Sequence, residues 1–99
     1  MARSIIDGSN YCYICSRYKM RYVLASDTHH IFGAANRNKS DEDGLTVRLC
    51  RKCHSQVHDT SNIFYHELHR IGEQAWLDHY HKTIQDFILR YGKNYIYDL

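Results

Sequence analysis

The chain has 99 residues, of which 43% are hydrophobic and 24% charged, a composition that suits one small globular domain and excludes a disordered or low-complexity chain. The formal net charge is only +2, but residues 1–58 hold nine Lys and Arg against five Asp and Glu, whereas residues 59–99 hold four against six. The basic first half favours a phosphate-bearing partner.

Neither membrane insertion nor secretion is indicated. The sequence has no apolar run of about 18 residues, so we expect no transmembrane helix. The opening stretch MARSIIDGSNYCY lacks the apolar core of a signal peptide, and we therefore expect the protein to be cytosolic. In that compartment four cysteines are typically metal ligands rather than disulfides.

The first half of the chain predicts a short sheet. Residues 1–11 have the composition of an irregular arm, and CYIC at 12–15 that of a tight knuckle. YKMRYVLAS at 18–26 is rich in β-branched and aromatic residues and predicts a strand or hairpin. IFGAANRNKSDEDG at 31–44 predicts a loop. LTVRL at 45–49 alternates and predicts a second strand.

The second half predicts helices. A short helix begins at Arg51 and should end near residues 59–61, which can cap the next helix. An apolar stripe then predicts a helix that ends near Tyr80, and a last helix with Gly92 as its C-terminal cap. We expect a single α+β domain over residues 1–99, with a sheet and one helix around metal and two helices packed on them.

The cysteines form two CxxC pairs, Cys12 with Cys15 and Cys50 with Cys53. Each pair can wrap one cation, and two pairs close a tetrahedral four-cysteine zinc site without an open position. Such a closed site is structural, so we assign this zinc to folding. The alternatives are four buried free thiols, or a redox pair, although neither CxxC lies in a βαβ pattern.

Two histidines lie four residues apart on the predicted helix that begins at Arg51. His54 and His58 should therefore share one face, as two ligands of one ion must. This spacing also arises by chance on surfaces. We expect the remaining C-terminal histidines to be ordinary surface or half-buried residues: His66, His69, His79 and His81.

The pair His29-His30 adds weight to a metal site. Neighbours on a strand point to opposite sides, so one of them can bind an ion while the other faces something else. A histidine beside a metal can serve as general base near neutral pH. The alternative is that His29 and His30 are simply polar residues at the end of a strand, without a functional role.

Three segments together resemble the HNH endonucleases, the ββα-metal nucleases. They are CYIC at 12–15, THHIFG at 28–33 and LCRKCHSQVH at 49–58. Their order and spacing are similar to those of small HNH proteins of bacteriophages and prophages, over about residues 10–60. The resemblance implies a zinc-stabilised ββα-metal core over 1–60, with residues 61–99 as added helices, and the cytoplasm of a bacterial host as its location.

The resemblance also implies roles for matching positions. His29 corresponds to a metal ligand, His30 to the general base, and His54 with His58 to helical metal ligands. In many members of that family an asparagine at the entry to the second strand fixes the loop that carries the base. That position falls here on Gly44 or Leu45, and neither can do this by its side chain.

Asn36 or Asn38, in the long loop between the histidine pair and the second strand, are possible substitutes for that asparagine. The residue that would fill its role is left open by the sequence.

The implied activity is hydrolysis of DNA phosphodiester bonds with a divalent ion such as Mg²⁺, Mn²⁺, Ni²⁺ or Zn²⁺ at His29, His54 and His58. We expect DNA as the partner, held by a set of basic side chains near the site: Arg37, Lys39, Arg48, Arg51 and Lys52. The alternatives are a catalytically weak or inactive zinc-stabilised module that binds DNA or protein, and a purely structural zinc protein.

Overall fold

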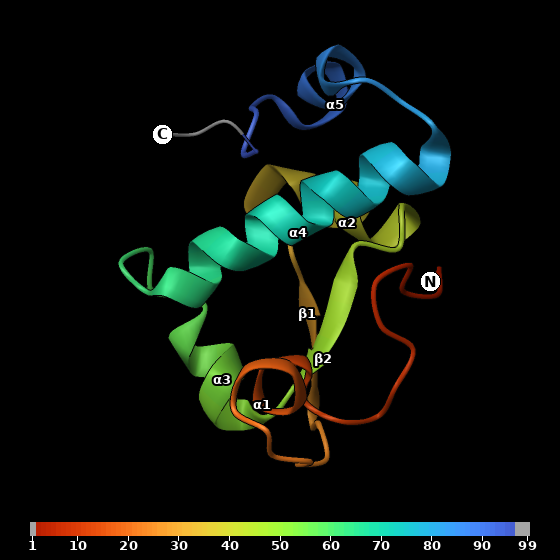
Figure 1. Ribbon diagram of the computed structural model, residues 1–99. Coiled ribbons are helices and arrows are strands. Elements are labelled where there is room, and N and C mark those ends of the chain that lie inside the picture. Colours follow the sequence, from red (N-terminus) through yellow and green to blue (C-terminus); the bar gives the residue numbers. More distant parts are fainter. Residues whose placement is uncertain (1, 97–99) are drawn as a thin grey trace.

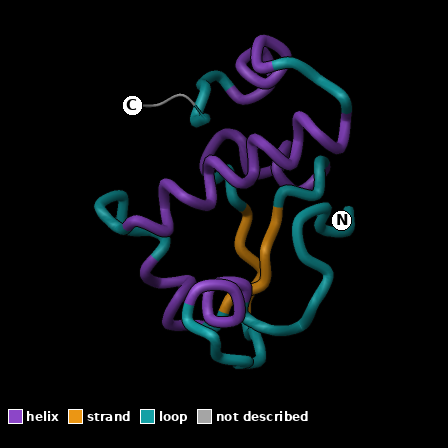
Figure 2. Tube along the Cα trace, in the orientation of Figure 1, coloured by secondary structure: helices purple, strands orange, loops and turns teal. Residues whose placement is uncertain are grey.

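The computed structural model describes residues 2–96 and shows a small α+β fold (Figure 1). A two-stranded sheet lies at the centre, α1 and α3 lie at one end of it, and α4 crosses the other end (Figure 2). In chain order the elements are α1 (Tyr13–Tyr18), β1 (Asp27–His30), the 3-10 helix η1 (Ala34–Asn36), α2 (Arg37–Glu42), β2 (Thr46–Leu49), α3 (Arg51–Gln56), α4 (Ile63–Tyr80) and α5 (Ile84–Tyr91).

Strands β1 and β2 are antiparallel, and their register decides which face each side chain takes. His29 pairs with Val47, and Thr28 pairs with Arg48. Because side chains alternate along a strand, His29 and Val47 share one face and Thr28 and Arg48 share the other. Both His29 and Val47 are buried, so their face is the one turned to the core.

The segment 18–26 is not the predicted strand, because α1 runs to Tyr18 and the first strand begins only at Asp27. The backbone N–H groups of Lys19 and Arg21 both donate to the carbonyl of Cys15, at 3.1 and 3.0 Å. The chain is thereby folded back around the CYIC knuckle, in which Cys12 caps α1. Extended pairing in this segment is limited to one bridge between Tyr11 and Leu24.

The predicted loop at 31–44 contains η1 and the six-residue helix α2. Its polar residues have weak helix propensity. However, α5 forms hydrogen bonds with this segment, and they cannot be predicted from the neighbouring sequence. Lys39 Nζ donates to the Arg90 carbonyl at 2.9 Å, and the Tyr91 hydroxyl donates to the Lys39 carbonyl at 3.0 Å. Tertiary contacts therefore hold this segment helical.

The remaining elements lie close to their predicted places. β2 falls within 45–49 and α3 begins at Arg51, as predicted. The cap of α4 is Asn62, whose Oδ1 accepts from Phe64 N at 2.8 Å, rather than a residue of 59–61. α4 ends at Tyr80, and Gly92 caps α5 in the left-handed region at φ 92°, both as predicted.

Helices α4 and α5 close the core over the segment that follows β1. Gly72 of α4 lies so close to this segment that a Cβ there would be 3.0 Å from Ile31 Cγ2. Phe32 then packs against Phe87 and Tyr91 of α5, with ring centroids 5.4 and 4.8 Å apart.

Across residues 2–96, the helices are all too short or too polar to cross a bilayer.

Candidate metal centres

The four cysteines lie together between the start of α1 and the start of α3. Their sulfur atoms all lie within 4.8 Å of one another. Cys15 Sγ is 3.9 Å from Cys50 Sγ and 3.7 Å from Cys53 Sγ. Zn–S bonds of about 2.3 Å in a tetrahedron place sulfurs about 3.8 Å apart. The cluster could therefore hold a metal ion such as zinc with little rearrangement.

The surroundings of the thiols are consistent with a bound cation. Burial raises the pKa of the Cys15 and Cys53 thiols. Burial acts in the same direction on Cys50, but hydrogen bonds from Cys53 and the other cysteines outweigh it and lower the Cys50 pKa to about 7. Lys19 Nζ lies 3.7 Å from Cys53 Sγ. One ammonium cannot balance four thiolates, whereas a divalent cation would favour deprotonation of all four.

His29, His54 and His58 form a second cluster. One ligand atom from each lies within 4.8 Å of the others, and the ring centroids are 4.9 to 5.5 Å apart. His54 lies on α3, but His58 does not, because α3 stops at Gln56 and not near residues 59–61 as predicted. His29 is buried and His58 is exposed, so the cluster opens to solvent on one side.

His29 is held in the form that binds metals. Burial, followed by the nearby His54 and His58, lowers the pKa of His29 to about 3. At neutral pH its imidazole is therefore uncharged and has a lone pair on one nitrogen. A neutral imidazole is the form that binds a divalent ion.

Asp27, at the start of β1, orients one of these rings. Its Oδ2 lies 3.0 Å from His54 Nδ1, and that hydrogen bond is the main cause that lowers the Asp27 pKa. With Nδ1–H donating to the carboxylate, Nε2 of His54 has the lone pair for an ion. Arg51 also donates to Asp27, at 3.2 Å. Such carboxylate–histidine pairs commonly support metal ligands.

The two histidines of the HH pair have different partners. His29 lies with the other two candidate ligands, whereas His30 Nε2 lies 3.2 Å from Asp41 Oδ1 of α2. The His30 side chain is 12% exposed. His29, His30 and His58 all line one cavity of about 270 Å³, so the ring of His30 and the cluster face a common space.

Helix α4 contributes to the same cavity through Tyr65 and His69. His69 is buried, and its Nδ1 lies 2.6 Å from the Tyr65 carbonyl. His69 is therefore not the surface or half-buried residue that was predicted, whereas His66, His79 and His81 are exposed. No local pattern marks His69, because the residues it joins in the cavity are distant in sequence.

Ser40 ties the segment after His30 to the start of β2. Its Oγ accepts from Phe32 N at 3.2 Å and donates to the Leu45 carbonyl at 2.7 Å. Ser40 thus fixes this loop by its side chain, a role for which Asn36 and Asn38 were the candidates in the sequence. Asn36 instead donates to the Tyr91 carbonyl at 3.0 Å, and Asn38 is exposed.

The five predicted DNA contacts do not gather in one place. Arg37 is exposed on α2, and Arg51 and Lys52 are exposed on α3. Lys39 donates to α5, as described above. Arg48 lies on the sheet face away from His29, where it lines a cavity under the N-terminal arm.

Comparison with known proteins yields no match to a protein-family model, a curated protein or a solved structure.

Proposed function

We propose that the protein is a metal-dependent endonuclease that hydrolyses DNA phosphodiester bonds. The observation that carries the proposal is the cluster of His29, His54 and His58 beside a cavity that His30 also lines. The resemblance of CYIC, THHIFG and LCRKCHSQVH to the HNH nucleases supports the same reading.

His29, His54 and His58 would hold a divalent ion and leave part of its coordination open to the substrate. A divalent ion bound there would stabilise the negative charge that develops on the phosphate. The surrounding residues fit this role, because His29 is neutral and Asp27 directs Nε2 of His54 away from itself.

His30 is proposed as the general base. When Asp41 accepts a hydrogen bond from Nε2–H of His30, Nδ1 of that ring has the lone pair that can take a proton from water. The carboxylate thereby fixes the tautomer and the orientation of the ring, as the aspartate does in a histidine–aspartate pair.

The four-cysteine cluster is proposed as a structural zinc site that supports the second site. Cys53 directly precedes His54, so a metal held by Cys53 would anchor α3 at the point where it presents His54. A rigid first site of this kind suits a chain with a small core.

One observation favours a second candidate, a zinc-stabilised module that binds DNA or protein without cutting. The position where HNH relatives have asparagine is Gly44 or Leu45 here, and neither has an amide side chain. Ser40 fixes the loop by a different route, which is why cleavage remains our first proposal.

Plasmid nicking separates the two candidates. Wild type would be incubated with supercoiled DNA and Mg²⁺, Mn²⁺ or Ni²⁺, alongside His30→Ala and the control His79→Ala, which changes an exposed histidine of α4. We expect nicking by wild type and by the control. His30→Ala should keep its zinc and lose about 10²–10⁴-fold in rate. If zinc-loaded wild type cuts with none of the ions, or His30→Ala cuts at the wild-type rate, the proposed mechanism is wrong.

A further inference from the structure

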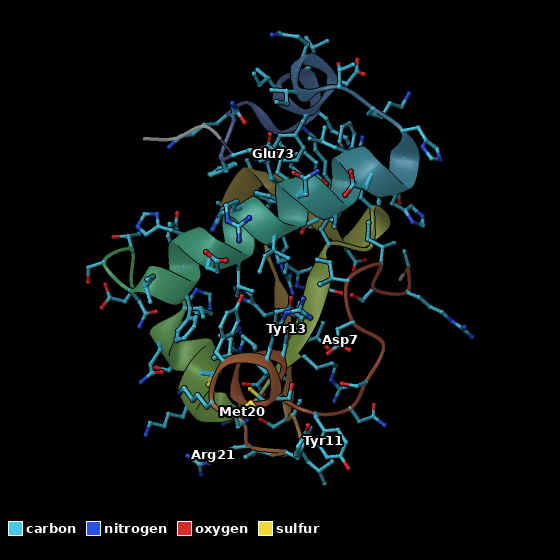
Figure 3. All side chains as sticks on the ribbon, viewed as in Figure 1. Asp7, Tyr11, Tyr13, Met20, Arg21 and Glu73 are labelled. Carbon is cyan, nitrogen blue, oxygen red and sulfur yellow. The ribbon has the colours of Figure 1, made fainter. Side chains whose placement is uncertain are left out.

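Large apolar side chains project into solvent from the turn that follows α1 and from Tyr11, just before that helix. Met20 is 80% exposed, Tyr22 73%, Leu24 69% and Tyr11 42%. We call these four residues, together with the exposed cations Arg17 and Arg21, the knuckle tip. Figure 3 shows Tyr11, Met20 and Arg21 at the end of the molecule where α1 lies.

The backbone holds the knuckle tip in place. Cys12 N donates to the Val23 carbonyl at 2.7 Å, and Ala25 N donates to the Asn10 carbonyl at 2.9 Å. These bonds clamp both ends of the turn beside the cysteine cluster. The exposed side chains of the knuckle tip therefore lie on a turn that backbone hydrogen bonds hold in place.

Met20 has an unfavourable conformation and gains no burial in return. Its φ is 54°, in the left-handed region where a residue with a Cβ is strained and glycine is favoured. An exposed methionine at a strained position contributes little to folding. Strain and exposed apolar surface together mark sites that contact a partner.

The charge of this segment selects the kind of partner. Residues 8–26 include Arg17, Lys19 and Arg21 and no Asp or Glu. The nearest acid is Asp7, which lines a shallow pocket together with Arg17 and Tyr22. A surface with three cations, tyrosine rings and one acid beside it suits a polyanion that has flat apolar faces. Unpaired nucleotides fit this description, because their bases stack on aromatic side chains while cations follow the phosphates.

Other polyanions fit less well. In a duplex the base faces are covered by stacking, so tyrosine rings would reach only the edges of the grooves. Anionic membranes are usually bound by clusters of about 4–8 Lys and Arg, more than this segment has. Lys19, moreover, is directed to Cys53 Sγ, 3.7 Å away.

We infer that the knuckle tip binds unpaired nucleotides of a single-stranded nucleic acid, with Tyr22 as the main stacking surface and Arg21 on the phosphates. This inference deepens the proposed function, on which it rests for nucleic acid as the partner, and adds a contact surface outside the histidine-lined cavity. The six-residue step from Leu24 to His30 spans at most about 20 Å, so one strand can reach both places.

Fluorescence anisotropy with a labelled oligothymidine and a duplex of the same length tests the inference, without added divalent ion so that nothing is cut. Tyr22→Ala should raise the Kd for the single strand about 5- to 150-fold, and Tyr22→Trp should restore binding. The duplex Kd should change much less. The control is Leu89→Ala, which removes an equally exposed apolar side chain (85%) from α5 and should leave both Kd values unchanged.

Salt dependence tests the proposed phosphate contact. Arg21→Ser should reduce the slope of log Kd against log salt by about 0.7, the loss of one single-strand phosphate contact. Lys82→Ser, an exposed cation in the turn between α4 and α5, should leave the slope unchanged. Zinc content and circular dichroism would confirm that each variant is folded.

Three outcomes would overturn the inference: an unchanged single-strand Kd in Tyr22→Ala, an equal loss on the duplex, or binding to phosphatidylserine vesicles that Tyr22→Ala removes. The readout is separate from cleavage. If wild type nicks plasmid and Tyr22→Ala binds single strands normally, only the proposed binding role of the knuckle tip is wrong. Wild type that never nicks but shows the Tyr22 effect refutes only the nuclease.

Discussion

The carboxylate of Asp27 holds the imidazole of His54, with 3.0 Å between Oδ2 and Nδ1. This contact joins the start of β1 to α3 and leaves Nε2 of His54 for an ion. Asp27 has no place in the motifs that drew attention to the histidines. It is nevertheless the residue that decides which nitrogen of His54 can serve as a ligand.

Asp27→Ala should therefore weaken the second ion while leaving the zinc in place. We expect about 10- to 100-fold weaker binding of Mn²⁺ or Ni²⁺, measured by calorimetry on zinc-loaded protein. Asp59→Ala is a suitable control, because Asp59 is exposed and pairs with Ser61. Equal affinities of the Asp27 variant and wild type for Mn²⁺ or Ni²⁺ would show that Asp27 does not support metal binding.

Loss of a zinc ligand should unfold the protein. Cys53→Ser should abolish stoichiometric zinc in elemental analysis and the cooperative thermal transition in circular dichroism. Structural zinc contributes about 10–16 kcal/mol in small peptides, as much as the whole stability of a typical domain. Ser16→Ala, beside Cys15, should keep both zinc and fold. Wild type purified without zinc would contradict the assignment of the four-cysteine cluster.

Asp41 should matter for the rate of cleavage and not for metal binding. Asp41→Asn leaves His30 without its carboxylate partner, so kcat should fall at least about tenfold, with the His30→Ala loss of about 10²–10⁴-fold as the limit. KM and the affinity for the second ion should stay unchanged. The neighbouring Glu42→Gln, which touches Arg90 instead, is the control. A parallel loss of metal affinity would show a purely structural role.

Glu73 should make the protein less stable at high pH. It is fully buried, Oε1 accepts from Tyr95 N at 2.6 Å, and Oε2 has no hydrogen-bond partner within residues 2–96. Burial raises the pKa of Glu73 above its ordinary 4.5. The folded state thus retains a proton that the unfolded chain releases, and stability falls as the pH rises from 4.5 through the raised pKa.

Glu73→Gln should remove this pH dependence and raise the free energy of unfolding at pH 8 by roughly 1–3 kcal/mol. Urea unfolding at several pH values measures both effects. Asp78→Asn, on the exposed side of α4, should follow the wild-type curve. A Glu73→Gln curve parallel to that of wild type would show that Glu73 does not titrate on unfolding.

Met20→Gly should stabilise the fold by up to about 1 kcal/mol. Relief of the left-handed strain is worth about 1–2 kcal/mol, and the extra freedom of glycine in the unfolded chain removes about half of that. Met20→Ala keeps the strain and should leave the unfolding free energy near that of wild type. Denaturant unfolding compares the three proteins. A Met20→Gly protein less stable than Met20→Ala would show that the turn is not strained.

The sequence by itself determined the features that depend on near neighbours. The CxxC spacing lets the two thiols of each pair reach one cation, and a period of 3.6 residues fixes the apolar face of α4. Gly92 was recognisable as a cap because a helix end needs left-handed backbone there. The short strand before Arg51 followed from its alternation in the same way.

The tertiary structure decided everything that depends on residues distant in sequence. The segment 18–26 has strand-like composition, yet its backbone N–H groups bond to Cys15 because the cysteine knuckle turns the chain. Helix α2 forms because α5 supplies partners for it. Asp27 has no local signature, since it acts through Arg51 and His54. His69 likewise packs against Phe32, which only folding brings near. Residue spacing can indicate which side chains are candidate metal ligands. The residues that orient those ligands depend on how the chain segments pack together.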